Sequence, residues 1–288
     1  MGTFRKLGGG ELAPGLYVTA TPIGNARDIT LRALDVLAAC DVIAAEDTRV
    51  SAKLLSIHGI SRPLTSYNDH NGARERPKLL ARLKHGARVA LISDAGTPLV
   101  SDPGYKLIRE ALREGIAVHV VPGASATLAA LALGGLPIDR FFFAGFLPAK
   151  SGERGSALAE LKDIRATLIF FESAQRLAES LAQMAAVLGD RAVAVTRELT
   201  KLHEEVRRGT LVLLAEQYGR EPAPKGEVTI LVGPPSERSA DASRIDALLS
   251  RALPFMPVKE ASELVALALD RPRKEIYQRA LKKKNDGD

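Results

Sequence analysis

The residues best suited to chemistry follow a short apolar run in the first third of the chain. Val89–Ile92 leads into Ser93–Pro98, which reads Ser-Asp-Ala-Gly-Thr-Pro. Asp94 can accept hydrogen bonds from an amine or a ribose hydroxyl, and Gly96 lets backbone groups come close to a ligand. We therefore predict that this segment is a ligand-binding loop.

Three other loops share this position after an apolar run. They are Thr21–Asn25, Glu46–Arg49 and Pro122–Ala126, and each contains glycine, proline or charged residues. In α/β proteins, ligands bind at the carboxyl ends of the strands, where such loops meet. Together the loops predict a binding cleft at one edge of a sheet.

Some of these residues also have a structural explanation. Asp47 or Thr48 could cap the helix that follows, and Arg49 could form an ion pair with Glu46. We interpret Asp102, which precedes a proline, as the cap of another helix and not as part of the site.

Several common cofactors and metals are disfavoured by what the sequence lacks. Neither a Gly-x-Gly-x-x-Gly fingerprint nor a phosphate-binding Gly-Lys-Ser/Thr loop follows the first apolar run, which argues against NAD, FAD and ATP. His70 has no second histidine or cysteine at metal-ligand spacing, so we expect no metal. The single cysteine, Cys40, excludes an internal disulfide and is typical of a reducing cytoplasm.

Apolar runs alternate with amphipathic helical stretches along the chain, which predicts an α/β fold. The runs are apolar at successive positions, as expected for strands buried on both faces in a mostly parallel sheet. The helix Leu31–Ala39 is expected to bury Leu31, Leu34, Leu37 and Ala38. The expected strands are Leu16–Ala20, Val42–Ala45, Val89–Ile92, Val118–Val121, Phe141–Phe143, Leu168–Phe171, Ala192–Thr196 and Val228–Val232.

Two breaks divide the chain. Gly134 and Gly135 end a helix shortly before Pro137, and Gly233–Ser236 forms a stiff polar break after the last expected strand. We expect a disordered segment over residues 1–14, an N-terminal α/β domain over 15–136, a C-terminal α/β domain over 137–233 and a basic unit of three short helices over 241–284.

The positive charge is concentrated at the carboxyl end. The net charge is +6, and seven basic against three acidic residues leave +4 between Arg271 and Asp288. Such an end could bind nucleic acid or could only aid solubility. No stretch approaches the ~20 apolar residues of a membrane span, and the first ten residues lack the apolar core of a signal peptide. We therefore expect a soluble cytoplasmic protein that does not bind membranes.

Taken together, the motifs resemble those of a known family. Thr21–Asn25, Ala45–Arg49, Ser93–Asp102, Pro122–Ala126 and Lys225–Glu227 stand in the order and spacing of the bacterial 16S rRNA (cytidine-2′-O)-methyltransferases. These enzymes are methyltransferases of the tetrapyrrole-methylase type.

The resemblance extends from about Gly15 to Leu281 and includes Gly135–Lys150, and it departs from the family at Ala20, where proline is more usual. It implies two α/β domains with S-adenosylmethionine in the cleft between them, a small C-terminal helical unit and a homodimer. It also implies methylation of the ribose 2′-oxygen of a decoding-region cytidine in the 16S rRNA of the small ribosomal subunit.

The resemblance also implies site residues. Methyl transfer from a sulfonium to a hydroxyl requires that the two atoms be aligned and that some group remove the hydroxyl proton. Our candidates for this base, in falling order, are Asp47, Asp94 and His70. The expected cofactor-binding residues are Pro22, Gly24, Asp94, Ala95, Gly96, Thr97, Pro98, Ser125, Ala126, Phe171 and Leu199, and the expected substrate-binding residues are Arg49, Asn68, Lys225, Arg273 and Lys274.

Two other functions compete with this one. A methyltransferase of the same fold could act on a tetrapyrrole carbon, but those enzymes carry a loop richer in glycine where this chain has Thr21–Asn25, and the C-terminal helices here are basic. A non-catalytic RNA-binding protein would need aromatic side chains on which bases stack. Only 5% of the residues are aromatic, and none is tryptophan.

Overall fold

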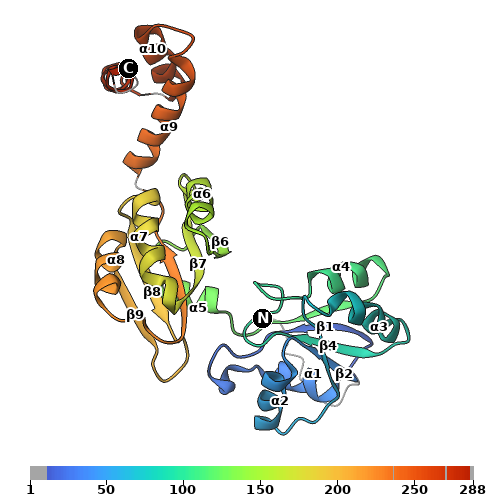
Figure 1. Cartoon of the computed structure of the whole chain (residues 1–288). Coiled ribbons are helices and arrows are strands. Elements are labelled where there is room, and N and C mark those ends of the chain that lie inside the picture. Colours follow the sequence, from blue (N-terminus) through green and yellow to red (C-terminus); the bar gives the residue numbers. More distant parts are fainter. Residues whose placement is uncertain (1–11, 236, 270, 286–288) are drawn as a thin grey trace, which may run out of the picture.

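The computed structural model describes residues 12–235, 237–269 and 271–285. Figure 1 shows two α/β domains and a helical unit that follows them at the C-terminal end. Most of the segment expected to be disordered, residues 1–11, lies outside the described residues. Its last part is held in place, because Leu12 packs against the N-terminal domain and the Ala13 carbonyl accepts a hydrogen bond from the Tyr17 hydroxyl (2.8 Å).

The N-terminal domain has a five-stranded sheet in which all strands are parallel. Its strands are β1 (Gly15–Thr19), β2 (Val42–Ala45), β3 (Leu64–Ser66), β4 (Arg88–Ile92) and β5 (Val118–Val121), and its helices are η1 (Ala26–Asp28), α1 (Leu31–Ala39), α2 (Thr48–Ile57), α3 (Gly72–Lys84) and α4 (Tyr105–Arg113). The sheet order is β3-β2-β4-β1-β5. The chain runs one way across the sheet from β1 to β2 and the other way from β4 to β5. The neighbours β1 and β4 therefore form the switch point at which α/β proteins bind ligands.

Helix α1 buries a different face from the one expected. Leu31 is 81% exposed, whereas Ala33, Val36 and Leu37 are buried. Both sets of residues satisfy the spacing of one helix face, so the pattern alone does not separate them. Thr30 caps the helix by accepting a hydrogen bond from the Ala33 amide (3.1 Å), and this places Leu31 in the first turn, facing solvent.

The C-terminal domain has a second five-stranded sheet, and it is mixed. Its strands are β6 (Phe141–Phe146), β7 (Thr167–Ser173), β8 (Ala192–Arg197), β9 (Glu205–Thr210) and β10 (Glu227–Val232), and its helices are α5 (Ala126–Gly134), α6 (Ser151–Leu161), η2 (Ala174–Arg176), α7 (Leu177–Leu188) and α8 (Leu211–Arg220). In the order β6-β7-β10-β8-β9, only β6 and β7 are parallel. The expectation of a mostly parallel sheet is therefore wrong for this domain.

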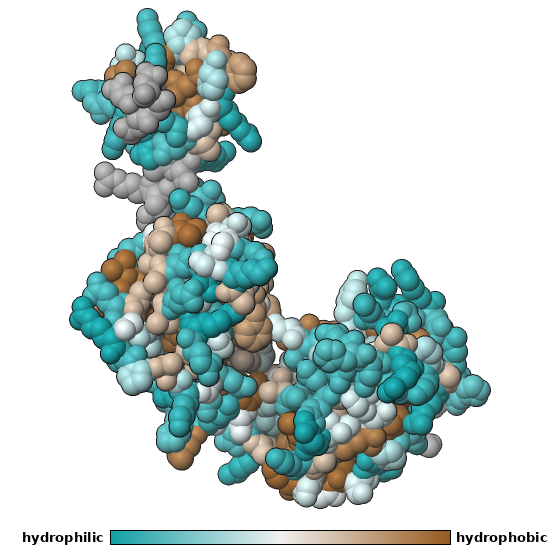
Figure 2. All heavy atoms as spheres, in the orientation of Figure 1, coloured by the Kyte–Doolittle hydropathy of each residue, from teal (hydrophilic) through white to brown (hydrophobic). Residues whose placement is uncertain are grey.

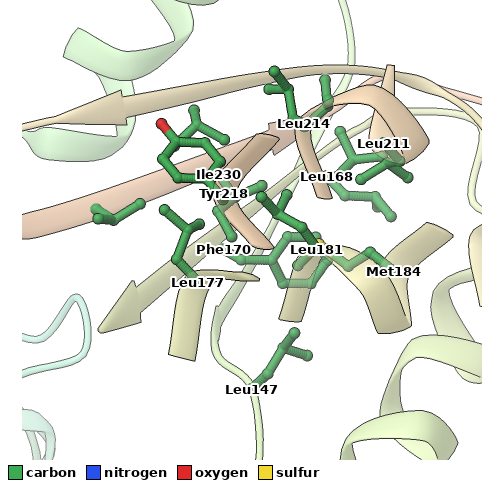
Figure 3. Packing of buried hydrophobic residues seen from close by; sticks show 14 of the residues in the cluster. Leu147, Leu168, Phe170, Leu177, Leu181, Met184, Leu211, Leu214, Tyr218 and Ile230 are labelled. Atoms are coloured by element: carbon green, nitrogen blue, oxygen red, sulfur yellow. The ribbon is translucent and has the colours of Figure 1, made fainter. Parts of the chain in front are cut away.

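Helices cover both faces of this second sheet, which explains why its strands are apolar at successive positions. Leu168, Phe170 and Ile230 pack with α7 and α8 in the core that Figure 3 shows. Ile169 and Leu231 point the other way and pack with α5. An apolar run thus reports two covered faces, and it does not reveal the direction of the neighbouring strand.

Helix α5 packs on the second sheet although it follows directly from the first. It contacts β8, β9 and β10. A Cβ atom at Gly134 would overlap the Leu231 side chain, so the helix reaches this close only because the residue is glycine. The boundary that we expected near residue 136 thus falls after α5, a helix that already packs on the second sheet.

Two strands have no counterpart in the sequence-based expectation. Leu64–Ser66 is only three residues long and half-buried, and Glu205–Thr210 reads Glu-Val-Arg-Arg-Gly-Thr. Both lie at the edge of their sheets. An edge strand has one neighbour and can face solvent, so it needs no apolar run.

The C-terminal unit consists of α9 (Glu237–Ala252), α10 (Val258–Leu269) and α11 (Arg273–Asn285). It has a hydrophobic core of its own, in which Ile245, Val265 and Ile276 are buried. The Arg279 guanidinium binds the Asp246 carboxylate through two hydrogen bonds (2.5 and 2.6 Å) and ties α11 to α9. None of the helices in the described ranges has the length and apolar character that a membrane span requires.

Candidate active site

A cavity of about 490 Å³ lies between the two α/β domains, where the surface is hollowed in Figure 2. Loops of the N-terminal domain and the start of α5 form one side, which we call the first wall. Residues of the C-terminal domain form the other side, the second wall. The first wall consists of Ile23, Glu46, Asp94, Ala95, Gly96, Thr97, Val100, Ser101, Asp102, Ser125, Ala126 and Thr127, and the second wall of Phe146, Phe171, Glu172, Ser173, Ala174, Gln175, Thr196, Leu199, Gly226, Glu227, Val228 and Thr229.

Hydrogen bonds lock the loops of the first wall together. The Asp94 carboxylate accepts a hydrogen bond from the Asp47 amide (3.0 Å), which joins the loops after β2 and β4. Thr21 and Gly96 exchange two backbone hydrogen bonds (2.8 and 3.1 Å), which join the loops after β1 and β4. Gly96 has a φ of 79°, a conformation that favours glycine. These contacts hold the carboxylates at the switch point of the sheet.

Three carboxylates of the first wall have raised pKa values. Burial is the main cause of the raised pKa of Glu46, Asp94 and Asp102, and repulsion by a neighbouring carboxylate adds to it in each case. None of the three forms an ion pair with another described residue. Across the same ranges, no group of three or more His, Cys, Asp or Glu side chains could hold a metal ion. The wall therefore offers carboxylates that bind protons more readily than free ones do.

The expectation that Asp102 caps a helix is wrong. Helix α4 begins at Tyr105, and Gly104 occupies the N-cap position with a φ of 135°. Asp102 lies instead in the loop that lines the cavity, with its carboxylate beside the Ser93 hydroxyl. The Asp-Pro pair is typical of a helix start, but the glycine that follows it moves the start of the helix further along the chain.

Asp47 and Arg49 lie beside the first wall and do not line the cavity. Asp47 caps α2, since its carboxylate accepts a hydrogen bond from the Arg49 amide (2.8 Å). The Arg49 guanidinium, whose side chain is 86% exposed, forms an ion pair with the same carboxylate (2.6 Å). Hydrogen bonds from Arg49 lower the pKa of Asp47 to about 2. Of the two proposed caps, Asp47 is confirmed and Thr48 is instead the first residue of α2, and Arg49 pairs with Asp47 and not with Glu46.

The polar loop before α3 also lies outside the cavity. The His70 side chain is exposed, and the His70 amide donates a hydrogen bond to the Asn68 side chain (3.1 Å). The Asn68 amide group donates to the Ser66 hydroxyl (3.3 Å) and to the Glu46 carbonyl (3.5 Å). Asn68 therefore lies next to the first wall, whereas His70 faces solvent.

The second wall combines aromatic rings with a buried carboxylate. Phe171 packs edge to face against Phe146, with ring centres 5.6 Å apart. The Glu172 side chain is 1% exposed and accepts hydrogen bonds from Arg176 (2.7 Å) and from the Ser180 hydroxyl (2.6 Å). The rings provide an apolar surface, and Glu172 ties the end of β7 to the helix that follows.

The start of α5 contributes small residues to the first wall. Ser125 caps the helix by accepting a hydrogen bond from the Leu128 amide (3.4 Å), and Ala126 follows it in the wall. The buried Thr127 hydroxyl has no hydrogen-bond partner among the described residues. Buried hydroxyls normally find a partner, so this one is available to a bound ligand.

The structure brings most of the expected cofactor residues together. Eight of the eleven line the cavity: Asp94, Ala95, Gly96, Thr97, Ser125, Ala126, Phe171 and Leu199. Pro22, Gly24 and Pro98 do not line it, but each is next to a residue that does. That these residues bind a cofactor remains a prediction.

The expected substrate residues lie in three separate places. Arg49 and Asn68 adjoin the first wall, and the exposed Lys225 precedes a residue of the second wall. Arg273 and Lys274 begin α11 in the C-terminal unit, where Arg273 forms an ion pair with Glu263 (3.2 Å). Their contact with a substrate remains a prediction as well.

Sequence reasoning missed several wall residues besides Asp102. Thr196 and Thr229 are buried threonines in strands that are apolar apart from a charged residue at one end. The Thr196 hydroxyl donates to the Thr229 carbonyl (3.2 Å). A polar residue inside a buried strand is costly without a role, and this pattern could have marked both. Phe146 offered no such sign, because it is one of four phenylalanines in β6.

Comparisons with known proteins agree with this architecture. Residues 15–215 match the Tetrapyrrole (Corrin/Porphyrin) Methylases family, and residues 239–284 match the RsmI C-terminal HTH domain. The solved structure of the uroporphyrin-III C-methyl transferase from Thermus thermophilus, complexed with S-adenyl homocysteine, matches with a TM-score of 0.54 at 20% identity, over 75% of this chain and 96% of that one. At this identity the likeness concerns the fold alone.

Closer relatives are similar in sequence along nearly the whole chain. Ribosomal RNA small subunit methyltransferase I of Mesorhizobium japonicum is 52% identical over 95% of this chain and 94% of the relative. The protein of the same name from Erythrobacter litoralis is 50% identical over 95% of this chain and 96% of the relative. The predicted fold of two α/β domains with a C-terminal helical unit is thus confirmed, and the chain belongs to the ribosomal RNA small subunit methyltransferase I group of the tetrapyrrole (corrin/porphyrin) methylase family.

Proposed function

We propose that the chain transfers a methyl group from S-adenosylmethionine to the ribose 2′-oxygen of a cytidine in the decoding region of 16S rRNA. The observation that carries the proposal is the carboxylate-rich cavity at the switch point of a chain whose relatives are rRNA small subunit methyltransferases. As a member of this family, the chain is an S-adenosylmethionine-dependent methyltransferase.

The residues of the cavity suit S-adenosylmethionine. The volume of about 490 Å³ lies in the range of small-molecule sites. The molecule carries an ammonium group and a positively charged sulfur, which the carboxylates of the first wall complement, and Ile23, Phe171 and Leu199 offer apolar contacts to its adenine ring. Asp94–Thr97 and Ser125–Ala126 are the other residues that we propose to hold it. When bound, it supplies a methyl group that is open to attack because the sulfur is positive.

Asp94 is our candidate for the group that accepts the hydroxyl proton. It lies in the first wall, and burial raises its pKa. Asp47, the first candidate from the sequence, is bound by Arg49 with a pKa lowered to about 2, and His70 lies outside the cavity. A carboxylate with a raised pKa is the stronger base, so Asp94 now precedes the other two.

We propose that the small ribosomal subunit is the substrate and that basic and polar residues outside the cavity bind its RNA. Arg49, Asn68 and Lys225 adjoin the walls, where a target strand must pass to reach the cavity. Arg273 and Lys274 in the C-terminal unit are placed to contact phosphates, which position RNA without reading its sequence. Deleting the chain after residue 233 should weaken rRNA binding and flatten its dependence on salt.

We also propose that the protein is a homodimer in the cytoplasm. β6 is an edge strand of the second sheet, and its Phe141 and Phe142 are 47% and 41% exposed. An apolar edge strand in contact with water favours association with another chain. Light scattering should therefore report twice the chain mass of 30.8 kDa, and Phe142→Glu should shift it toward the monomer.

A methyl-transfer assay tests the proposed function. The purified protein is incubated with labelled S-adenosylmethionine and intact small subunits, naked 16S rRNA or a tetrapyrrole precursor. We expect label on the 2′-oxygen of one cytidine. Transfer only to the tetrapyrrole would favour the carbon methyltransferase, and an absence of S-adenosylmethionine binding would favour a non-catalytic RNA-binding protein.

A further inference from the structure

Two loops from different domains meet beside the cavity. The loop after β1 contributes Ile23–Asn25, and the loop after β8 contributes Leu199–Lys201; in Figure 1 the loop between β8 and β9 extends toward the N-terminal domain. The Asn25 amide donates a hydrogen bond to Thr200 Oγ1 (3.1 Å). Ile23 and Leu199, each 7% exposed, belong to one buried cluster. We call this contact the interdomain clasp.

The clasp leaves no room for a side chain at Gly24. A Cβ atom there would lie 2.5 Å from Lys201 Cγ, 2.8 Å from Thr200 Oγ1 and 2.9 Å from the Leu199 carbonyl oxygen. Gly24 is not among the residues with positive φ, so close approach and not backbone conformation calls for glycine. The expected cofactor residue Gly24 therefore faces the other domain.

The second loop of the clasp has an unfavourable backbone. Among the described residues, the non-glycine residues with positive φ are Leu99, Ser101, Glu198 and Thr200, and all four lie in loops that adjoin the cavity. Thr200 has a φ of 65°, which a β-branched residue rarely adopts. Such a conformation persists only where the surroundings hold it, and it is common where a loop must present a group in one position.

Charged contacts hold this loop in shape. The Thr200 amide donates to the Glu204 carboxylate (2.7 Å). Lys201 Nζ binds both the Glu198 carboxylate (2.8 Å) and the Glu227 carboxylate (2.9 Å), and Glu227 lines the cavity. The Thr200 hydroxyl is thus fixed before it meets Asn25, and the shape of the loop is tied to the second wall.

We infer that Gly24 and Thr200 are positioning residues whose contact sets the closed form of the cavity and thereby its affinity for S-adenosylmethionine. Ile23 and Leu199 carry the effect, because each directly precedes Gly24 or Thr200 in the clasp and also lines the cavity. Neither Gly24 nor Thr200 needs to touch the reacting atoms. The inference rests on the proposed function, since it concerns the same cavity and the same ligand.

Calorimetric titration with S-adenosylmethionine tests this inference on the full chain. Gly24→Ala should weaken binding by about 30-fold or more, because the backbone carbonyl of Leu199 must move. Thr200→Val keeps the branched shape and removes the hydroxyl, and it should weaken binding about fivefold. Thr200→Ser keeps the hydroxyl and should restore wild-type affinity. Gly152→Ala is the matched glycine control, since a Cβ there meets nothing within 4 Å.

Kinetics separate positioning from damage to the fold. For Thr200→Val we expect a higher KM for S-adenosylmethionine, an unchanged kcat at saturating cofactor and an unfolding temperature equal to that of Thr200→Ser. Wild-type affinity in both Gly24→Ala and Thr200→Val would overturn the clasp, as would a kcat of Thr200→Val that stays low at saturation. If the wild type itself binds no S-adenosylmethionine, the proposed function fails instead.

Discussion

The carboxylates of the two walls differ in whether they form ion pairs. In the first wall, Glu46, Asp94 and Asp102 form no ion pair with any described residue, and burial raises their pKa values. In the second wall, Glu172 is bound by Arg176 and Glu227 by Lys201. Both walls carry negative charge, but only the second one neutralises it within the protein.

This difference assigns separate tasks to the two domains. An unpaired, partly buried carboxylate is poised to bind a cation or accept a proton. A carboxylate that is paired with a guanidinium and a hydroxyl already has its charge compensated within the protein, and it mainly fixes local geometry. We therefore expect changes in the first wall to alter activity and changes in the second wall to alter stability.

Asp94→Asn should have the largest effect. Removing the proposed proton acceptor should lower kcat by about 100-fold or more, because general base catalysis is lost. The free energy of unfolding should not fall, because burial disfavours the charged form of this carboxylate in the folded state, as its raised pKa shows. Transfer to small subunits and urea unfolding measure the two quantities. Asp47→Asn is the matched variant, and a greater loss of kcat there would restore the order expected from the sequence.

Glu172→Gln should mainly destabilise the fold. The change removes the carboxylate that accepts hydrogen bonds from Arg176 and Ser180 and leaves a charge partly buried without its partner. We expect the free energy of unfolding to fall by about 2 kcal/mol. Glu227→Gln is the control, because its side chain is 74% exposed and its ion pair should be worth less than about 1 kcal/mol. Equal stability of the two variants would show that the buried contacts of Glu172 with Arg176 and Ser180 do not stabilise the fold.

Acidification should stop catalysis before it unfolds the protein. A general base must be deprotonated, so kcat falls as the pH drops through the raised pKa of Asp94. Glu198 and Glu205 behave in the opposite way, because hydrogen bonds from Lys201 and Arg207 lower their pKa values. Their stabilising effect is present above the unfolded pKa of about 4.3 and is lost only as the pH falls through the lower, folded value.

This third prediction is checked by following kcat and circular dichroism from pH 8 to below 4. The activity should decline while the helical signal is still that of the native protein. If both signals are lost over the same pH range, Asp94 does not differ from Glu198 and Glu205 as described.

Lys274→Ala should have the smallest effect and spare both walls. If Lys274 contacts a phosphate, its loss should weaken rRNA binding a few-fold and reduce the salt slope by about 1. The kcat at saturating rRNA and its pH profile should stay those of the wild type. Arg220→Ala removes one exposed positive charge from α8 and is the control. An equal change in the salt slope of this control would show that net charge, and not position, is what matters.

The sequence predicts the first wall better than the second. Loops after buried strands converge wherever the strands are parallel, so an apolar run followed by Ser93–Pro98 was enough to place Asp94 in the cavity. In the second sheet, the same kind of run belongs to antiparallel strands. The order of the strands in this sheet places Thr196 of β8 beside Thr229 of β10. A run of apolar residues contains no information on that pairing.

Contacts between the domains were the least predictable part. Gly24 suggested a close approach of a ligand, but its neighbours Leu199–Lys201 lie some 175 positions further along the chain. Asp102 was misassigned because a local Asp-Pro pattern was given more weight than its place in the loop after β4. In both cases a local rule was satisfied, while the deciding neighbour came from elsewhere in the fold.

The C-terminal unit, which we propose to bind RNA, has a hydrophobic core separate from those of the two α/β domains. Since α9, α10 and α11 pack on one another, the unit can hold RNA without any change in the walls of the cavity. Binding energy from such a tethered module raises the local concentration of the target, as in multivalent recognition. If the unit binds RNA as we propose, this energy would stabilise the bound substrate and the transition state equally, so it would lower KM and leave the chemical step to the cavity. Exchange of this unit for another is then expected to change which RNA is bound and not the reaction that the cavity performs.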